Sequence, residues 1–283
     1  MRLRSLLFVP GDRPERFEKA MASGADAIIL DLEDSVVSAA KGRAREFIAE
    51  FLSRRTPNCA IFVRVNPLDT DDLEKDLSIF GSGLPDALVL PKAEGAAFVR
   101  ALSVRVSEQA GVSIPILPIA TETPAAIFQL GSYAQVGSEI CGLTWGAEDL
   151  PAAIGATAAR EADGGYTEPY RMVRSLALFA AHAAGVPAIE TVYPDIRDIA
   201  GLVAYARRGR RDGFTGMLAV HPAQVEVINR AFTPSAEEIL RAERIIGAFA
   251  ANPEAGTIQV DGRMLDRPHL KLAMAIVQSS TDS

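Results

Sequence analysis

The sequence has few cysteines, few lysines and no long hydrophobic run. Its 283 residues include two cysteines, Cys59 and Cys141, and neither has the spacing of a metal site. We therefore expect two buried free thiols in a reducing compartment. No stretch approaches the roughly 20 apolar residues of a membrane-spanning helix, and the apolar run near Met1 is too short for the core of a signal peptide. These absences predict a cytoplasmic protein with no membrane partner.

Positive charge is also scarce. Lysine and arginine together number 29, against 36 aspartates and glutamates, which gives a net charge of −7 and a pI near 5.2. This balance disfavours nucleic acid or an anionic membrane as the main partner. Most of the basic residues are arginines, whose planar fork suits the carboxylates and phosphates of small anionic substrates. The lysines are confined to positions 19, 41, 75, 92 and 271.

Eight short apolar runs alternate with segments that carry helix signals. The runs are apolar rather than alternating, which is typical of parallel strands covered on both faces. A strand–helix unit repeated eight times predicts the α/β class and a (β/α)8 TIM barrel. A doubly wound open sheet is the alternative, but Gly81-Ser82-Gly83 precedes a strand and so does not match that fold's Gly-rich fingerprint. The predicted strands are residues 3–9, 27–32, 60–65, 87–90, 116–120, 140–145, 188–192 and 217–220. The predicted helices open at Pro14 and continue with residues 43–51, 69–80, 96–109, 124–130, 169–184, 195–211 and 222–229.

The pattern changes after Phe232. We predict a catalytic barrel over residues 1–232 and a C-terminal appendage over residues 233–283. In the appendage, Ser235 is a candidate N-cap for a helix, and Asp261-Gly262 suits the turn of a hairpin over residues 256–265. A final helix is predicted over residues 269–278. A segment of this size buries too little apolar surface to fold alone, so we expect it to pack on its own barrel or on a neighbouring subunit.

Active sites of (β/α)8 barrels lie at the carboxyl ends of the strands. Here those ends carry a high density of carboxylates, which is unfavourable without a metal ion. Glu122 and Asp149 follow successive apolar strands, where an acidic side chain is costly unless it is compensated. We predict that the two share a cation, and the lack of Cys or paired His ligands favours Mg²⁺ or Mn²⁺ over zinc. The polar residues at these ends are Asp31, Glu33, Asp34, Arg64, Asn66, Lys92, Glu122, Glu148, Asp149, Tyr193, Asp195 and His221.

Several of these side chains have alternative interpretations. Any one of the carboxylates, Asp195 and Glu148 above all, can instead be the N-cap or a first-turn acid of a helix, where the helix dipole stabilises it. Lys92 follows a barrel strand, so it is a candidate for Schiff-base formation with a carbonyl substrate. An acidic surrounding keeps an ammonium protonated, however, which disfavours that chemistry.

Several segments also resemble a known family. They resemble the citrate lyase β-subunit-like (CitE-like) proteins of the HpcH/HpaI aldolase and malyl-CoA lyase superfamily, in the same order from residue 4 to about residue 272. The motifs are specific for the family but not for its substrate. They are residues 4–12 (RSLLFVPGD), 31–36 (DLEDSV), 63–66 (VRVN), 89–92 (VLPK), 146–150 (GAEDL), 191–198 (TVYPDIRD) and 221–225 (HPAQV).

The resemblance implies a Mg²⁺-dependent carbon–carbon lyase, with Mn²⁺ as a possible substitute. Its substrate would be a 3-hydroxyacyl thioester such as citryl-, malyl- or citramalyl-CoA, which yields acetyl- or acyl-CoA and a 2-oxo acid. The thiol would be CoA or an acyl-carrier protein. By position, Glu122 and Asp149 correspond to the metal ligands, with Glu122 also beside the substrate. Arg64 corresponds to the residue that binds the substrate carboxylate during catalysis. Asp31, Glu33 and Asp34 would form the outer shell that holds metal-bound waters.

The resemblance extends to the C-terminal segment. Residues 262–268 (GRMLDRP) match the family's Gly-x-Met-x-Asp-x-Pro motif, so Asp266 corresponds to an acid–base residue that a neighbouring subunit supplies. This implies a homotrimer or a dimer of trimers. The alternative is that Asp266 only caps the last helix. The phosphates of CoA would meet Arg13, Arg16 and Lys19 at the opening of the first helix, although these side chains also suit solvated surface charge.

The chain departs from the family pattern in two places. The strand-5 motif often reads Glu-Thr/Ser-Ala-x-Gly, and here Ala126 replaces the glycine, which bears on acyl specificity. Residues 156–168 do not align and are expected to lie over the metal side of the barrel.

Two other functions stay open. One is a class II pyruvate-type aldolase for free hydroxy-oxo acids. The other is a non-catalytic or complex-dependent β-like subunit, or a CoA-binding regulatory protein.

Overall fold

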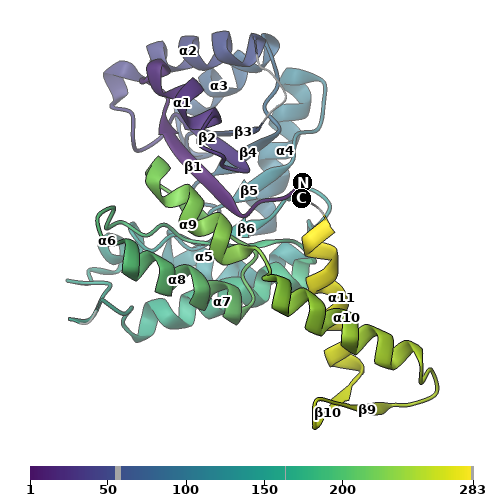
Figure 1. The fold of residues 1–283 in the computed structure, drawn as a ribbon. Helices are drawn as coiled ribbons and strands as arrows, with labels where there is room; N and C mark the ends of the chain where they lie inside the picture. The colour runs from purple at the N-terminus through teal and green to yellow at the C-terminus, as the bar shows by residue number, and fades with distance from the viewer. Residues whose placement is uncertain (55–58, 163, 282–283) are drawn as a thin grey trace. The chain divides into compact units, whose positions relative to one another are not determined.

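The computed structural model describes residues 1–54, 59–162 and 164–281. The chain forms two compact units, Leu3–Asn229 and a second made of Arg230–Ser283 with Met1–Arg2. The first unit holds eight parallel strands in the order β5-β4-β3-β2-β1-β8-β7-β6, and Figure 1 labels β1 to β6 among them. Its strands are β1 Ser5–Pro10, β2 Ala27–Asp31, β3 Ala60–Arg64, β4 Ala87–Leu90, β5 Ile116–Pro118, β6 Leu143–Thr144, β7 Ala188–Glu190 and β8 Gly216–Ala219.

The two ends of this strand order meet. Parallel bridges join Ile116 to Ile140 and Ile119 to Thr144, so β5 and β6 lie side by side and the sheet forms a nearly closed barrel. The predicted (β/α)8 barrel is confirmed. β6 is shorter than predicted, because residues 140–142 pair with β5 through an isolated bridge and not through a continuous ladder.

Helices connect successive strands. They are η1 Pro14–Arg16, α1 Phe17–Met21, η2 Ser38–Ala40, α2 Lys41–Ser53, α3 Asp71–Leu77, η3 Ser78–Gly81, α4 Ala96–Ala110, α5 Pro124–Gln129, η4 Leu130–Gln135, α6 Leu150–Ile154, α7 Glu168–Ala184, α8 Ile199–Asp212 and α9 Pro222–Phe232. α6 was not predicted. α8 begins later than predicted because the Asp198 side chain accepts a hydrogen bond from the Gly201 N–H at 2.8 Å and so caps the helix.

Side chains from alternate strand positions fill the barrel. Ala27 and Ile29 of β2 belong to one buried apolar cluster with Phe62 of β3, Val89 of β4 and residues of β1, β5, β7 and β8. Because successive side chains of a strand point to opposite faces, this cluster marks the inward-facing positions. The outward-facing positions pack against the helices. The parity of the strands therefore decides which polar side chains at the strand ends face inward.

The second unit has its own small core. In α10 (Ala236–Ala250) the Ser235 side chain accepts from the Glu238 N–H, and Glu238 accepts from the Ser235 N–H, which forms a capping box. β9 (Thr257–Val260) and β10 (Arg263–Asp266) pair as an antiparallel hairpin. Asp261 and Gly262 have φ of 51° and 76° in its turn, as a two-residue hairpin turn of this kind requires. α11 spans Arg267–Thr281. The predicted docking of this unit on a neighbouring subunit stays a prediction.

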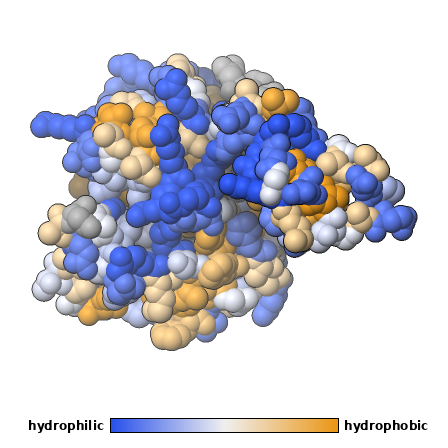
Figure 2. Space-filling model, turned by 60° about the horizontal axis from the view of Figure 1, so that its bottom comes forward, coloured by the Kyte–Doolittle hydropathy of each residue, from blue (hydrophilic) through white to orange (hydrophobic). Residues whose placement is uncertain are grey.

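The surface is mixed in character. On the face drawn in Figure 2, hydrophilic side chains separate several smaller hydrophobic patches. In the part of the chain that the structure describes, no helix has the length and apolar character needed to cross a membrane.

Candidate active site at the carboxyl ends of the strands

Asp31 and Arg64 form a buried ion pair where β2 and β3 end. They are partners in the strand register and continue the inward-facing alternation of Ile29 and Phe62. The Arg64 Nε and Nη2 donate to the two Asp31 carboxylate oxygens at 2.6 and 2.7 Å. Burial raises the pKa of Asp31, but the hydrogen bond and charge of Arg64 outweigh it and hold the pKa below its ordinary value. Asp31 is therefore ionised, and one edge of the Arg64 guanidinium is occupied.

The other acceptor positions of Asp31 are occupied too. The Glu33 N–H donates to Asp31 Oδ1 at 2.9 Å, and the Ser35 N–H donates to Oδ2 at 3.1 Å. With the two bonds from Arg64, each carboxylate oxygen accepts two hydrogen bonds, which is its usual capacity. Asp31 thus fixes both Arg64 and the turn after β2.

Glu33 lies between two cations. Arg64 Nη1 is 3.0 Å from Glu33 Oε2, and the Lys92 ammonium contacts Glu33 Oε1. Burial raises the pKa of Glu33, although the charges of Arg64 and Lys92 oppose this change. Asp34 is exposed and lies 3.8 Å from the Lys92 ammonium. The structure therefore brings the predicted site residues Glu33, Asp34 and Arg64 together with Lys92.

The surroundings of Lys92 argue against a Schiff base. Burial lowers the pKa of Lys92, but its hydrogen bond to Glu33 and the charges of Glu33, Glu122 and Asp34 raise it above its ordinary value. An amine must lose its proton before it can attack a carbonyl. Lys92 is held as an ammonium.

Glu122 is the most strongly perturbed carboxylate of the predicted set. It follows β5 and is 5% exposed, and its Oε2 accepts a hydrogen bond from the Lys92 N–H at 2.6 Å. Burial raises the pKa of Glu122 to about 8, and the charges of Asp149 and Glu33 add to the effect. With a pKa of about 8, Glu122 is largely protonated at neutral pH, and a cation bound beside it would favour the carboxylate. The site therefore fits a hard divalent cation with oxygen ligands.

Asp149 directly precedes α6 and is half-buried. Its side chain makes no capping hydrogen bond with that helix, so the interpretation as an N-cap is not supported. Across residues 1–54, 59–162 and 164–281, no three His, Cys, Asp or Glu side chains gather closely enough to form a metal site. The predicted pair of Glu122 and Asp149 would thus leave most positions around an ion to water, an arrangement typical of Mg²⁺.

The predicted CoA-binding side chains follow the carboxyl end of β1, just after a turn in which the Gly11 N–H donates to the Asp31 backbone carbonyl at 2.8 Å. Arg13, Arg16 and Lys19 are exposed, with Arg13 3.8 Å from Asp12 and Arg16 3.9 Å from Glu15. α1 has five residues and follows a three-residue 3-10 turn. Such a short helix contributes little dipole at its N-terminus, so the three cations themselves would have to bind the phosphates.

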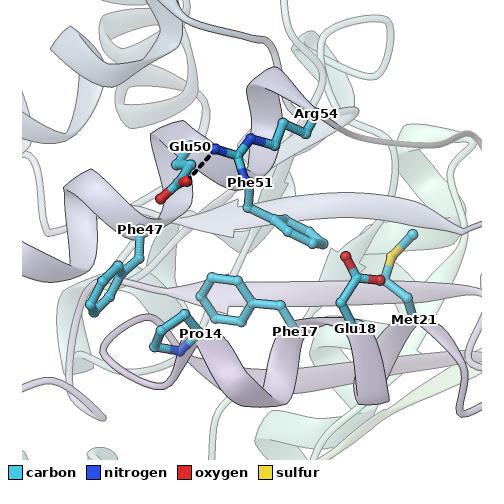
Figure 3. A pocket seen from close by; sticks show the side chains of 8 residues that line it. All are labelled: Pro14, Phe17, Glu18, Met21, Phe47, Glu50, Phe51 and Arg54. Atoms are coloured by element: carbon cyan, nitrogen blue, oxygen red, sulfur yellow. Dashed lines mark ion pairs between the residues drawn. The ribbon is translucent and has the colours of Figure 1, made fainter.

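A pocket of about 360 Å³ lies between α1 and α2 (Figure 3). Three phenylalanine rings line it, together with an ion pair between Glu50 and Arg54. None of the predicted site residues contributes to its wall. Its lining consists of Pro14, Phe17, Glu18, Met21, Phe47, Glu50, Phe51 and Arg54.

Asp266 belongs to the second unit, at the end of β10. Its carboxylate contacts His269 Nδ1, and both side chains are half-exposed. The hydrogen bond to His269 holds the pKa of Asp266 below its ordinary value. Asp266 directly precedes α11, so the position also suits the helix-capping alternative, and its predicted catalytic role is not decided by these contacts.

The sequence did not lead us to predict a buried polar network around Asn66, which follows β3. Asp76 is fully buried and accepts hydrogen bonds at 2.7 Å from the Asn66 N–H, the Asn66 side-chain amide and Arg45 Nε. The Asn66 side-chain oxygen in turn contacts the Lys41 ammonium. A signal was present in the sequence. Asp76 falls on the same helical face as the apolar residues Leu73, Leu77 and Phe80, where a charge needs a buried partner.

Comparisons with known proteins agree with the fold and with the resemblance. A family model described as HpcH/HpaI aldolase/citrate lyase matches residues 4–222. The citrate lyase subunit beta-like protein of Mycobacterium tuberculosis is 36% identical over 281 residues, covering 98% of this chain and 95% of the relative. The mitochondrial citramalyl-CoA lyase of Mus musculus is 33% identical over 302 residues, covering 98% and 86%. A crystal structure of Mycobacterium tuberculosis CitE with magnesium, acetoacetate and coenzyme A has a TM-score of 0.82 and 36% identity, and the match covers 98% of both chains.

The fold and these relatives define a TIM-barrel lyase. The chain belongs to the HpcH/HpaI aldolase/citrate lyase family. The predictions of a lyase and of its family are confirmed, and the magnesium in the CitE structure agrees with the predicted cofactor.

Proposed function

We propose that the protein is a Mg²⁺-dependent lyase that cleaves, or in reverse forms, a 3-hydroxyacyl thioester of the citryl, malyl or citramalyl type. The observation that carries this proposal is Glu122, a buried carboxylate whose pKa is raised to about 8 by burial and by the charges of Asp149 and Glu33, so that a bound cation would favour its ionised form at neutral pH. The names of the relatives support the substrate class, since one is a citramalyl-CoA lyase and another was crystallised with coenzyme A.

Glu122 and Asp149 would hold the ion. When bound, Mg²⁺ supplies Lewis-acid polarisation of the hydroxyl and carboxylate oxygens of the substrate. The Lys92 N–H orients one oxygen of Glu122. Because Asp31 already accepts four hydrogen bonds, the task of holding water around the ion would belong to Glu33 and Asp34.

Arg64 would bind the carboxylate of the oxo-acid half. Asp31 occupies its Nε–Nη2 edge, so the substrate would bind at the Nη1–Nη2 edge, where it would compete with Glu33, whose Oε2 lies 3.0 Å from Nη1. The guanidinium carbon of Arg64 lies over the Phe8 ring, 4.8 Å from the ring centre, and this contact helps to hold the guanidinium in place. A bidentate guanidinium–carboxylate pair adds both orientation and energy, which would fix the bond to be cleaved.

Asp266, supplied by a neighbouring subunit, would move the proton. In the direction of cleavage the substrate hydroxyl loses a proton, and the carbon–carbon bond breaks to give a 2-oxo acid and the enolate of the acyl thioester. The enolate carbon then takes up a proton. The hydrogen bond from His269 keeps Asp266 ionised, so Asp266 can accept the hydroxyl proton and return it to carbon.

The remaining assignments follow from this reaction. Arg13, Arg16 and Lys19 would bind the phosphates of CoA, and the shared site would require a homotrimer or a dimer of trimers. A CoA-dependent lyase with free thiols at Cys59 and Cys141 suits the cytoplasm.

The test uses purified protein with citryl-, malyl- and citramalyl-CoA, each with Mg²⁺ or with EDTA. We expect one ester to give a 2-oxo acid and an acyl-CoA in equal amounts, with the activity abolished by EDTA and by Glu122→Gln. Glu148→Gln, which changes an exposed acid on the same loop as Asp149, is the matched control and should stay active. Cleavage that survives EDTA, or release of free CoA without a 2-oxo acid, would refute the proposal.

A further inference from the structure

Glu190, the last residue of β7, is fully buried and faces away from the barrel interior. Its neighbour Ile189 belongs to the interior cluster, so Glu190 points outward by strand parity. Its Oε1 accepts hydrogen bonds from Trp145 Nε1 at 2.6 Å, from the Tyr205 hydroxyl at 2.9 Å and from the Thr191 N–H at 3.0 Å. Burial and the charge of Glu190 raise the pKa of Tyr205 well above its ordinary value, so the phenol stays a donor.

Arg174 of α7 balances the charge of Glu190. Its Nε donates to Glu190 Oε2 at 2.7 Å, and its Nη1 donates to Asp212 at 2.9 Å. The guanidinium also lies over the Phe214 ring, 4.7 Å from its centre. A buried ion pair is weak evidence for stability, because an apolar substitute can be equally stable, but it holds its partners in one geometry. The indole of Trp145 is one of the groups held in this way, because its N–H donates to Glu190 Oε1 at 2.6 Å.

Trp145 leads directly into the segment that carries Asp149. The next residue, Gly146, is bonded in both directions to Thr121, whose hydroxyl donates to the Gly146 carbonyl at 2.9 Å and accepts from the Gly146 N–H at 3.0 Å. A Cβ atom at Gly146 would lie 2.8 Å from Glu122 Cγ. The backbone at Gly146 therefore contacts Glu122 directly. Its position is set by Thr121 on one side and by Trp145 on the other.

The same indole ring receives the loop that follows α6. The Tyr166 ring packs against Trp145 in an edge contact with 5.2 Å between centroids. The guanidinium carbon of Arg160 lies over the Tyr166 ring, 4.0 Å from its centre. Trp145 thus touches both chain segments that flank α6. A shift of this ring would move the segment on which Asp149 lies.

We propose that Glu190 is a positioning residue of the metal site, because it holds Trp145 and thereby sets where residues 146–149 present Asp149 beside Glu122. This inference rests on the proposed function, in which Asp149 and Glu122 hold the cation. The effect is a matter of geometry. Outer residues that orient metal ligands typically change metal affinity by about 10- to 100-fold when they are substituted.

The experiment measures Mg²⁺ binding to the full-length metal-free protein by titration calorimetry, with urea denaturation run in parallel. The test variants are Glu190→Gln and Trp145→Phe. The amide of Glu190→Gln offers one acceptor oxygen where the carboxylate has two, so Arg174 and the indole N–H compete for it. The matched control is Tyr205→Phe, which removes a donor to the same Glu190 oxygen but from α8 and not from the segment that carries Asp149. Glu122→Ala reports whether the ion binds at the proposed site.

We expect Glu190→Gln and Trp145→Phe to raise the Mg²⁺ dissociation constant about tenfold or more, and Tyr205→Phe to change it by less than about twofold. A purely structural role predicts that metal affinity follows the loss of stability across all three variants, which would overturn the proposal. If Glu122→Ala weakens binding while both test variants bind like the wild type, the metal site stands and the positioning role is wrong. If Glu122→Ala leaves binding unchanged, the proposed metal site fails, and the positioning role fails with it.

Discussion

Arg174→Met should destabilise the barrel by several kilocalories per mole. Methionine keeps most of the packing of the arginine stem but leaves Glu190 without its cation. Removing one partner of a buried ion pair typically costs about 3–5 kcal/mol. Three neutral donors would still bind the Glu190 carboxylate, so we expect about 3 kcal/mol, at the lower end of that range. Against a typical total stability of about 5–15 kcal/mol, the variant should still fold.

The assay is urea denaturation followed by tryptophan emission. Trp145 is the only tryptophan in the chain and lies in the barrel unit, so the signal reports that unit alone. Arg171→Met is the control, because Arg171 lies one turn away on α7 in an exposed ion pair with Glu168. Such a pair contributes at most about 1 kcal/mol.

A double variant tests why Arg174→Met lowers the free energy of unfolding. If the cost of Arg174→Met comes from the orphaned charge, adding Glu190→Gln should recover about 1–3 kcal/mol relative to the sum of the single variants. A loss below about 1 kcal/mol for Arg174→Met, or strict additivity in the double variant, would show that the charge of Glu190 is not compensated as described.

Three further predictions concern the site itself. In metal-free protein the raised pKa of Glu122, about 8, should make the free energy of unfolding fall as pH rises from about 5 to 8, and Glu122→Gln should remove that fall when urea midpoints are compared in EDTA. Gly146→Ala should raise the Mg²⁺ dissociation constant about tenfold or more, since its Cβ would collide with Glu122, whereas Gly42→Ala in α2, with open space around it, should not. Borohydride added with a 2-oxo acid should leave Lys92 unmodified by mass spectrometry, and a reduced adduct would restore the Schiff-base interpretation.

Much of the barrel could be predicted from the chain alone. Each strand is a short apolar run buried on both faces, a property that does not depend on the partner strand. The regular alternation of strand and helix then leaves few ways to cover both faces of every strand. The short β6 and the unpredicted α6 show where prediction from the sequence stops. The length of β6 depends on its pairing with β5, and α6 depends on the path of the chain after β6.

The position of the site was also predictable in part. Glu122, Arg64 and Glu33 lie at or just after the ends of apolar strands, and in a parallel barrel all such ends meet on one side. The sequence alone therefore indicated an acidic site with an arginine in it. The strand ends do not reveal which side chains pair, so the double hydrogen bond of Arg64 with Asp31 became visible only in the register of β2 and β3.

The local sequence determined which residues form strands and which acids stand at their ends, because burial and periodicity are read within a few residues. Tertiary structure alone decided the state of the charges. Glu190 looked like an interior position of a strand until α7 and α8 brought Arg174 and Tyr205 onto it. The pKa of Glu122 likewise depends on its burial and on the charges of Asp149 and Glu33, which follow other strands. Electrostatic energy depends on distance and burial in space, and neither is encoded in sequence separation.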